Sequence, residues 1–345
     1  MTNNSWQLKT PHLNGTSVEQ KRAELKSYFH NTWQTYESLF SLINNDEAYF
    51  KRPEPLRHPL IFYFGHTATF FINKFILGKY IEQRINPKLE AICAVGVDEM
   101  SWDDLDSSHY DWPSVDEVKA YRKQVFDCVN AIIDNMPLSL PIQQDSLAWV
   151  ILMGCEHERI HLETSSVIMR MLPLSDLTMI DKYWQACEES GIQPKNEWLK
   201  INKQSIVLGK KAQDETYGWD NEYGTQHVDV DAFKASKYTV TNGEYMAFVD
   251  DGGYQNSRWW TEEGDAWRTY RNARMPRFWL KKNEQYFQRN LLNEIPLPLD
   301  WPVEVNYLEA KAFCQWKAAQ TGTFLRLPTE AEWYCLREKV TGDSP

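Results

Sequence analysis

A pair of histidines one helical turn apart, His157 and His161, constrains the fold of this chain more than any other feature. Both lie in an apolar run whose periodicity predicts a helix over residues 145–172. Residues i and i+4 share one face of a helix, so the two imidazoles can reach one common atom. Imidazole is a usual ligand of iron, zinc and copper, and the pair therefore indicates a metal site.

A third histidine, His66, is the candidate that would complete the site. It lies among aromatic residues in a second apolar run, 62–70, that also has helical character. A single histidine is more often a hydrogen-bonded core or surface residue than a ligand. A pair at i and i+4, together with a third histidine on a neighbouring core helix, favours the metal site instead.

The same residues also fit the H-E-x-x-H motif of zinc metalloproteases, in which Glu158 would be the general base. The glycine and third histidine of the extended motif are absent from residues 162–166, so this zinc hydrolase interpretation stays an alternative. Glu163 could be a carboxylate ligand. At about 100° per residue it falls nearly opposite the histidine pair, which favours a supporting, outer role for it. We expect three histidine ligands and open positions at which a substrate binds.

Length and composition predict two domains, 1–194 and 195–345, with the boundary near Lys195. The net charge of -11 argues against a nucleic-acid partner and a basic membrane anchor, and favours small molecules. The apolar run 59–81 contains His66, Asn73 and Lys74, so we expect a core helix rather than a membrane span. Six scattered cysteines and the absence of a signal-like start predict a cytoplasmic protein. The sequence makes no prediction of oligomeric state.

The first domain reads as a bundle of four helices: 18–43, one that opens at Pro59, 113–135 and 145–172. Ser114 and Glu117 have the spacing of a capping box at the start of the third helix. An acidic connector, 96–112, precedes that helix and includes Asp98 and Glu99. It is either a solvated loop or a clamp for the ammonium group of a substrate.

The second half has the pattern of a loop-rich α+β fold. Residues 205–210 and 227–233 alternate as strands, and long aromatic connections between elements are expected to carry function. Capping boxes predict the starts of three helices, of which the first two end at Gly252 and Gly322. The boxes are formed by Thr241 with Glu244, Asn306 with Glu309, and Thr329 with Glu332.

Several motifs carry a resemblance to a known family. Residues 57–67, 96–105 and 156–166 resemble the ovothiol-biosynthetic sulfoxide synthases, relatives of the ergothioneine sulfoxide synthases, and 325–333 resembles the hallmark of their second domain. The resemblance implies a DinB-like four-helix bundle followed by part of a domain similar to formylglycine-generating enzymes and C-type lectins. The fold class expected is therefore helical first and α+β second.

The resemblance also implies a mononuclear non-haem Fe(II) enzyme. Such an enzyme uses O2 to join the sulfur of L-cysteine to C5 of L-histidine, and His66, His157 and His161 would be the iron ligands. Glu163 matches the last position of the family's H-x-x-x-H-x-E pattern, which implies a supporting role. The ergothioneine relatives hold γ-glutamyl-cysteine with arginines. For the free cysteine of the ovothiol branch, Asp98 and Glu99 are hypothesised to meet the ammonium group.

The chain departs from the family at its end, because relatives continue beyond Pro345 through the rest of the lectin-like domain. The continuation carries a tyrosine thought to assist catalysis, so no catalytic residue is assigned. We expect a fragment or short form, with exposed aromatic side chains after about Lys195 and very low turnover. An inactive iron-binding or partner-binding fragment is the alternative function.

Overall fold

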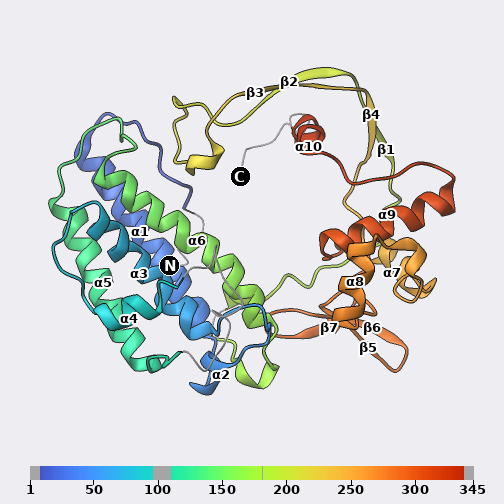
Figure 1. Cartoon of the computed structure of the whole chain (residues 1–345), viewed down its shortest axis with the longest axis horizontal. Coiled ribbons are helices and arrows are strands. Elements are labelled where there is room, and N and C mark those ends of the chain that lie inside the picture. The colour runs from blue at the N-terminus through green and yellow to red at the C-terminus, as the bar shows by residue number, and fades with distance from the viewer. Residues whose placement is uncertain (1–7, 96–109, 181, 338–345) are drawn as a thin grey trace. The chain divides into compact units, whose positions relative to one another are not determined.

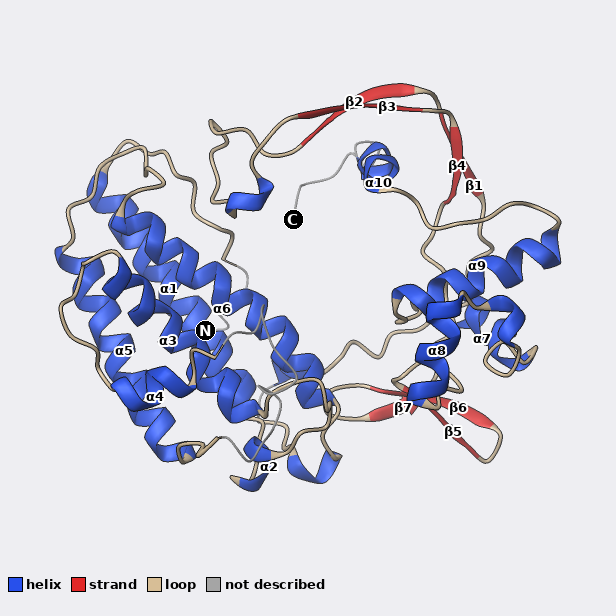
Figure 2. Ribbon diagram, viewed as in Figure 1, coloured by secondary structure: helices blue, strands red, loops and turns tan. Residues whose placement is uncertain are grey.

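The computed structural model of the chain describes residues 8–95, 110–180 and 182–337. Its internal contacts divide the chain into two compact units: Met1–Gln185 with Ala212–Asn221, and Ala186–Lys211 with Glu222–Pro345. The first is helical, and the second combines short strands with helices (Figure 2). The predicted fold class, helical first and α+β second, is confirmed. The exact domain boundary near Lys195 stays a prediction.

Four long helices form the bundle within residues 8–95 and 110–180. They are α1 (Val18–Phe40), α3 (Leu60–Leu77), α5 (Val115–Asn135) and α6 (Leu147–Arg170), each within a few residues of its predicted bounds. Helix α3 contacts α5 and α6, and α1 contacts the same two helices (Figure 1). Pro59 lies at the N-cap of α3, and Ser114 and Glu117 form the predicted capping box of α5.

Short elements complete the first unit. They are α2 (Glu47–Phe50), α4 (Pro87–Ile92), and the 3-10 turns η4 (Leu174–Asp176) and η5 (Lys182–Trp184). The segment Ala212–Asn221 also packs here, although it falls between two strands of the second unit. The Leu13 N–H donates to the carbonyl of Glu215 at 2.6 Å, and the ring of Tyr217 lies 4.8 Å from that of Trp149. The sequence patterns did not predict this return of the chain to the bundle.

Helix α3 is the most apolar helix of the bundle and packs as a core helix. By length and composition alone it could cross a membrane, but 67% of that apolar window is buried inside the protein. Gly154 of α6 lets the two helices approach, because a Cβ there would lie 2.1 Å from the ring of Phe71. This close packing brings the face of α3 that carries His66 toward α6.

Within the described residues, the second unit has three small antiparallel sheets. Strands β1 (Trp198–Ile201) and β4 (Phe233–Ser236) pair, as do β2 (Gln204–Leu208) and β3 (Gln226–Val230). The prediction of a single strand over 227–233 was wrong. The chain changes its pairing partner after Val230, so this segment forms two strands, β3 and β4. The third sheet has the order β5 (Trp279–Lys282), β6 (Gln285–Arg289) and β7 (Glu294–Pro296).

The sequence patterns predicted no strand within residues 279–296, where β5, β6 and β7 form. Charged and amide side chains interrupt the apolar alternation of these strands, while Asn283 and Glu284 form the turn with positive φ angles of 47° and 61°. Helix α8 (Glu262–Arg271) was missed for a similar reason, since it is polar on most of its surface. Both elements are stabilised by contacts with aromatic side chains distant in sequence.

The capping boxes predicted in this unit are confirmed. They open α7 (Asn242–Asp250), α9 (Tyr307–Thr321) and α10 (Glu330–Arg337). Gly322 ends α9 with a φ of +65°, a conformation that glycine adopts without strain. The turns η6 (Asp220–Glu222) and η7 (Ser257–Trp259) complete the described elements. Helices α7 and α9 pack around Phe248 and Trp316, whereas α10 packs against β2 and β3, and Phe324 and Trp333 are exposed.

Candidate metal centre

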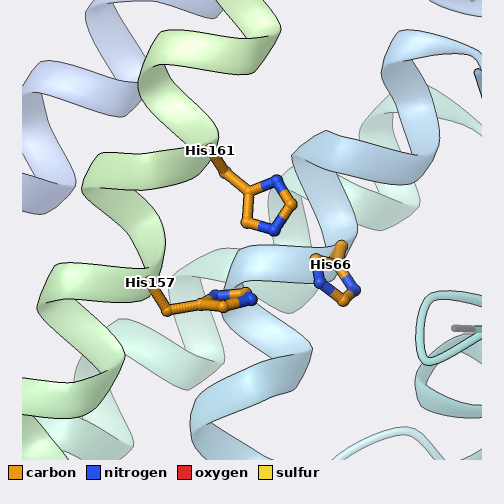
Figure 3. A group of neighbouring side chains, drawn as sticks. All are labelled: His66, His157 and His161. Atoms are coloured by element: carbon orange, nitrogen blue, oxygen red, sulfur yellow. The ribbon is translucent and has the colours of Figure 1, made fainter. Parts of the chain in front are cut away.

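Three imidazoles meet between α3 and α6. The ring nitrogens of His66, His157 and His161 that could bind a metal all lie within 4.8 Å of one another. The ring centroids are separated by 5.0 Å for His66 and His157, 4.8 Å for His66 and His161, and 4.5 Å for the pair on α6. Figure 3 shows His66 reaching from one helix toward the two rings of the other. The structure thus brings together the three histidines that the sequence singled out.

The His66 ring is oriented by a backbone carbonyl. Its Nδ1 lies 2.7 Å from the oxygen of Cys93, which can only accept, so Nδ1 carries the proton and Nε2 is left as the ligand atom. Cys93 follows α4, a helix capped by Asn86. Gly65 makes room for Cys93, since an added Cβ would lie 2.5 Å from its Sγ. The sequence analysis missed this partner, although Asn86 followed by a proline is a helix-start signal.

Aromatic rings pack against two of the histidines. Phe62 and Phe70 lie one turn before and one turn after His66 on α3. The Phe62 ring stacks on His66 at 5.0 Å, and the Phe70 ring stacks on His157 at 3.7 Å with an interplanar angle of 10°. These contacts restrict the rotation of the imidazoles and exclude water from one side of each ring.

The surroundings keep the pair on α6 neutral. Burial, assisted by His66, lowers the pKa of His161 to about 3. Burial also lowers the pKa of His157 well below its ordinary value, with further contributions from His161, His66 and Lys74. Within the described residues, Nδ1 of His157 and Nδ1 of His161 are buried without a hydrogen-bond partner. Neutral imidazoles with unused nitrogens are the form that binds a metal, so these residues fit a divalent transition-metal ion.

Comparison with known proteins places this site in a recognised domain pair. Residues 28–165 match the DinB superfamily, and residues 190–337 match the sulfatase-modifying factor enzyme 1-like domain. The chain joins a DinB domain to a sulfatase-modifying factor domain. All three histidines lie within the matched DinB domain.

The similar curated proteins include hercynine oxygenases and ergothioneine biosynthesis proteins. Hercynine oxygenase of Mycobacterium tuberculosis is 41% identical over 140 residues, which cover 40% of this chain and 31% of the relative. Hercynine oxygenase of Mycolicibacterium thermoresistibile is 40% identical over 140 residues, 40% of this chain and 29% of the relative. Ergothioneine biosynthesis protein 1 of Neurospora crassa is 26% identical over 332 residues, 85% of this chain and 36% of the relative.

The chain therefore spans between 29% and 36% of the length of these curated relatives. The matches support the sulfoxide synthase family that the sequence motifs indicated, and they do not single out its ovothiol branch.

Glu158 of the DinB domain lies between the two histidines of α6 in sequence, but it is fully buried in the bundle. Its Oε1 accepts from Arg122 at 2.9 Å and from the Thr67 hydroxyl at 3.1 Å. Burial raises the pKa of Glu158, and the Arg122 guanidinium opposes that rise. A zinc hydrolase would need this carboxylate beside a metal-bound water. The contacts with Arg122 and Thr67 do not fit that role.

Of the other predicted site residues, the structure describes Glu163. Glu163 of α6 is exposed, and its backbone carbonyl accepts from the Ser166 hydroxyl. Its supporting role at the metal stays a prediction. Asp98 and Glu99 lie outside the described residues, so their contact with a substrate ammonium group also stays a prediction.

Proposed function

We propose that the DinB domain holds one non-haem Fe(II) and contributes to an O2-dependent sulfoxide synthase. The observation that carries the proposal is the meeting of three imidazoles, two of them kept neutral by burial, in the DinB domain of a chain that is similar in part to hercynine oxygenases. Three neutral ligands leave open positions on an octahedral metal for substrates.

Bound Fe(II) would supply the oxygen chemistry and favour the deprotonated form of a thiol substrate. The reaction balances as follows: a C–H and an S–H bond are broken, and C–S and S–O bonds form. One oxygen atom of O2 ends in the sulfoxide and the other in water. The chain's own contribution is to fix the metal through His66, His157 and His161, with Phe62 and Phe70 limiting the access of water.

The proposed substrates are L-cysteine and L-histidine, joined through the cysteine sulfur and C5 of the imidazole. This choice rests on the resemblance of residues 57–67, 96–105 and 156–166 to the ovothiol branch. A second candidate is an ergothioneine-type reaction on hercynine, a histidine derivative, and it is favoured by the names of the similar proteins. A cytoplasmic location and the absence of nucleic-acid and membrane partners are further proposals.

The deciding experiment is an anaerobic Fe(II) titration of the chain, followed by exposure to O2. We expect one Fe(II) per chain, and a sulfoxide product, detected by mass spectrometry, that requires both a thiol and an imidazole substrate. Protein at a concentration close to that of substrate makes the product detectable even at very low turnover. Cysteine and γ-glutamyl-cysteine are each paired with histidine and hercynine, which separates the two candidate reactions. A chain that binds Fe(II) but forms no product would favour the alternative, an inactive iron-binding fragment.

Glu158→Gln tests the zinc hydrolase alternative. Because the amide oxygen of this variant can still accept from Arg122 and Thr67, we expect it to bind Fe(II) as the unaltered chain does. A protein that instead binds Zn(II), hydrolyses a peptide substrate and loses that turnover in Glu158→Gln would contradict the iron enzyme.

A further inference from the structure

A fully buried guanidinium links the helices of the bundle. Arg122 projects from α5 and is 1% exposed. Its Nε donates to Glu37 of α1, and its Nη1 donates at 2.8 Å both to the Phe64 carbonyl and to the Thr67 hydroxyl of α3. Its Nη2 donates to Glu158 of α6 at 2.9 Å. One side chain therefore contacts all three other long helices of the described bundle.

Two of the residues that Arg122 contacts are sequence neighbours of the proposed metal ligands. Thr67 follows His66 on α3, and Glu158 follows His157 on α6. The Thr67 hydroxyl also donates directly to Glu158 at 3.1 Å, which closes a triangle with the guanidinium. The Arg122 guanidinium thus binds both helices that carry the histidines, in each case at the residue that follows a proposed ligand.

We propose that Arg122, Thr67 and Glu158, here called the Arg122 cluster, are positioning residues that set the alignment of α3 against α6 and so the geometry of the metal centre. The proposal rests on the iron site proposed above. A helix that slides by one residue moves by about 1.5 Å, whereas ligand distances at a metal are held to within about 0.2 Å. Apolar packing alone is not directional, but a planar guanidinium with fixed donors is.

The surroundings of the guanidinium make this a rigid arrangement. Its carbon lies 4.1 Å from the centre of the Trp33 ring and 4.8 Å from that of Phe64. These rings fix the orientation of the guanidinium plane, and its N–H groups donate to residues of the three other helices. Lysine, with a single ammonium point, could not make these contacts together.

Arg159 offers a matched control. It lies on α6 next to Glu158 and donates at 3.0 Å to Thr32 and at 3.0 Å to Asn31, both on α1, while its guanidinium carbon lies 4.4 Å from the Tyr28 ring. Arg159 makes fewer contacts than Arg122 but contacts of the same kinds, and they tie α6 to a helix that carries none of the three histidines. Loss of Arg159 should therefore lower stability without changing the alignment of α3 and α6.

The test is to titrate the 345-residue chain with Co(II), whose visible spectrum reports ligand geometry, and with Fe(II) under anaerobic conditions. For Arg122→Met we expect affinity about 10–100-fold weaker, the size found for outer groups that orient ligands, and a changed Co(II) spectrum. Thr67→Val should show a smaller loss in the same direction. Arg159→Met should keep affinity and spectrum despite a lower melting temperature.

Each outcome bears on the proposal. If Arg122→Met fails to fold, Thr67→Val decides, since it removes one hydroxyl and no charge. Unaltered affinity and spectrum in folded Arg122→Met or in Thr67→Val, with the unaltered chain binding normally, would overturn the positioning role and leave the metal centre intact. An unaltered chain that binds neither ion would overturn the metal centre, and the positioning role with it.

Discussion

Some of the buried polar groups in the two units make different kinds of contact. In the bundle, Arg122 and Glu158 are charged groups deep in the core that connect helices to one another. In the second unit, buried Thr241, Glu309 and Glu332 instead complete capping boxes, so they satisfy the ends of their own helices. Helix caps stabilise locally. Buried ion pairs rarely add net stability, so their presence in the bundle indicates that alignment near the metal centre is what they secure.

The largest expected effect comes from replacing a histidine of the metal centre, because the bundle would then lose the Fe(II) binding that we propose for it. His161→Ala should abolish tight Fe(II) binding, because two imidazoles remain where three converge. Anaerobic titration measures this, and His227→Ala, an exposed histidine on β3 of the second unit, is the control. Retained tight binding in His161→Ala, or equal loss in His227→Ala, would contradict the proposed ligand set.

A large-to-small substitution in the core of the second unit tests whether the packing of that unit affects the metal centre. Phe248 is fully buried among aromatic residues there, and Phe248→Ala should cost the unit about 3–5 kcal/mol of its free energy of unfolding. Urea unfolding measures that cost, and the Fe(II) affinity should stay unchanged. Phe71→Ala is the matched change, since Phe71 packs against Gly154 and Phe29 inside the bundle and should weaken metal binding as well. A loss of Fe(II) affinity in Phe248→Ala would show that the units are coupled.

Helix α6 carries a buried carboxylate, Glu158, that connects helices, and an exposed one, Glu163, for which the family pattern predicts a role at the metal. Since Glu163 is exposed, Glu163→Gln should leave the stability of the bundle unchanged. The family pattern predicts that Fe(II) affinity or turnover falls by about 10–100-fold, as for groups that support ligands. Glu47→Gln, an exposed carboxylate on α2, is the control. Full affinity and turnover in Glu163→Gln would remove this residue from the site.

The smallest effect is the response of the second unit to acid. The bidentate contact with Arg326, together with the Thr329 cap, lowers the pKa of Glu332 from 4.5 to about 2. The ionised carboxylate therefore stabilises the fold above about pH 4.5, and this contribution is lost as the pH falls from 4.5 toward 2. Thermal unfolding between pH 7 and pH 2 should show a shallower loss in Glu332→Gln, with exposed Glu330→Gln as the control. Identical slopes would contradict the assignment.

Local signals account for what could be predicted of the fold. The apolar stripe of α1, the serine at the start of α5 and the glycine at the end of α9 each act within a few residues, so the sequence reports them directly. Strands β5, β6 and β7 were missed because their pairing partners and aromatic covering, not their own alternation, stabilise them. Element type was therefore predictable where the stabilising contacts are local.

The metal centre also has one part that the sequence predicts and another that depends on tertiary structure. The spacing of His157 and His161 determined by itself that both rings share one helix face, because the helical repeat is fixed. His66 could be singled out as a candidate, but only tertiary packing brought it to that face and placed the Cys93 carbonyl behind it. The Arg122 cluster depends wholly on tertiary structure: Thr67 and Glu158 are 91 residues apart in the chain, and a hydrogen bond over that separation leaves no periodic mark in the sequence.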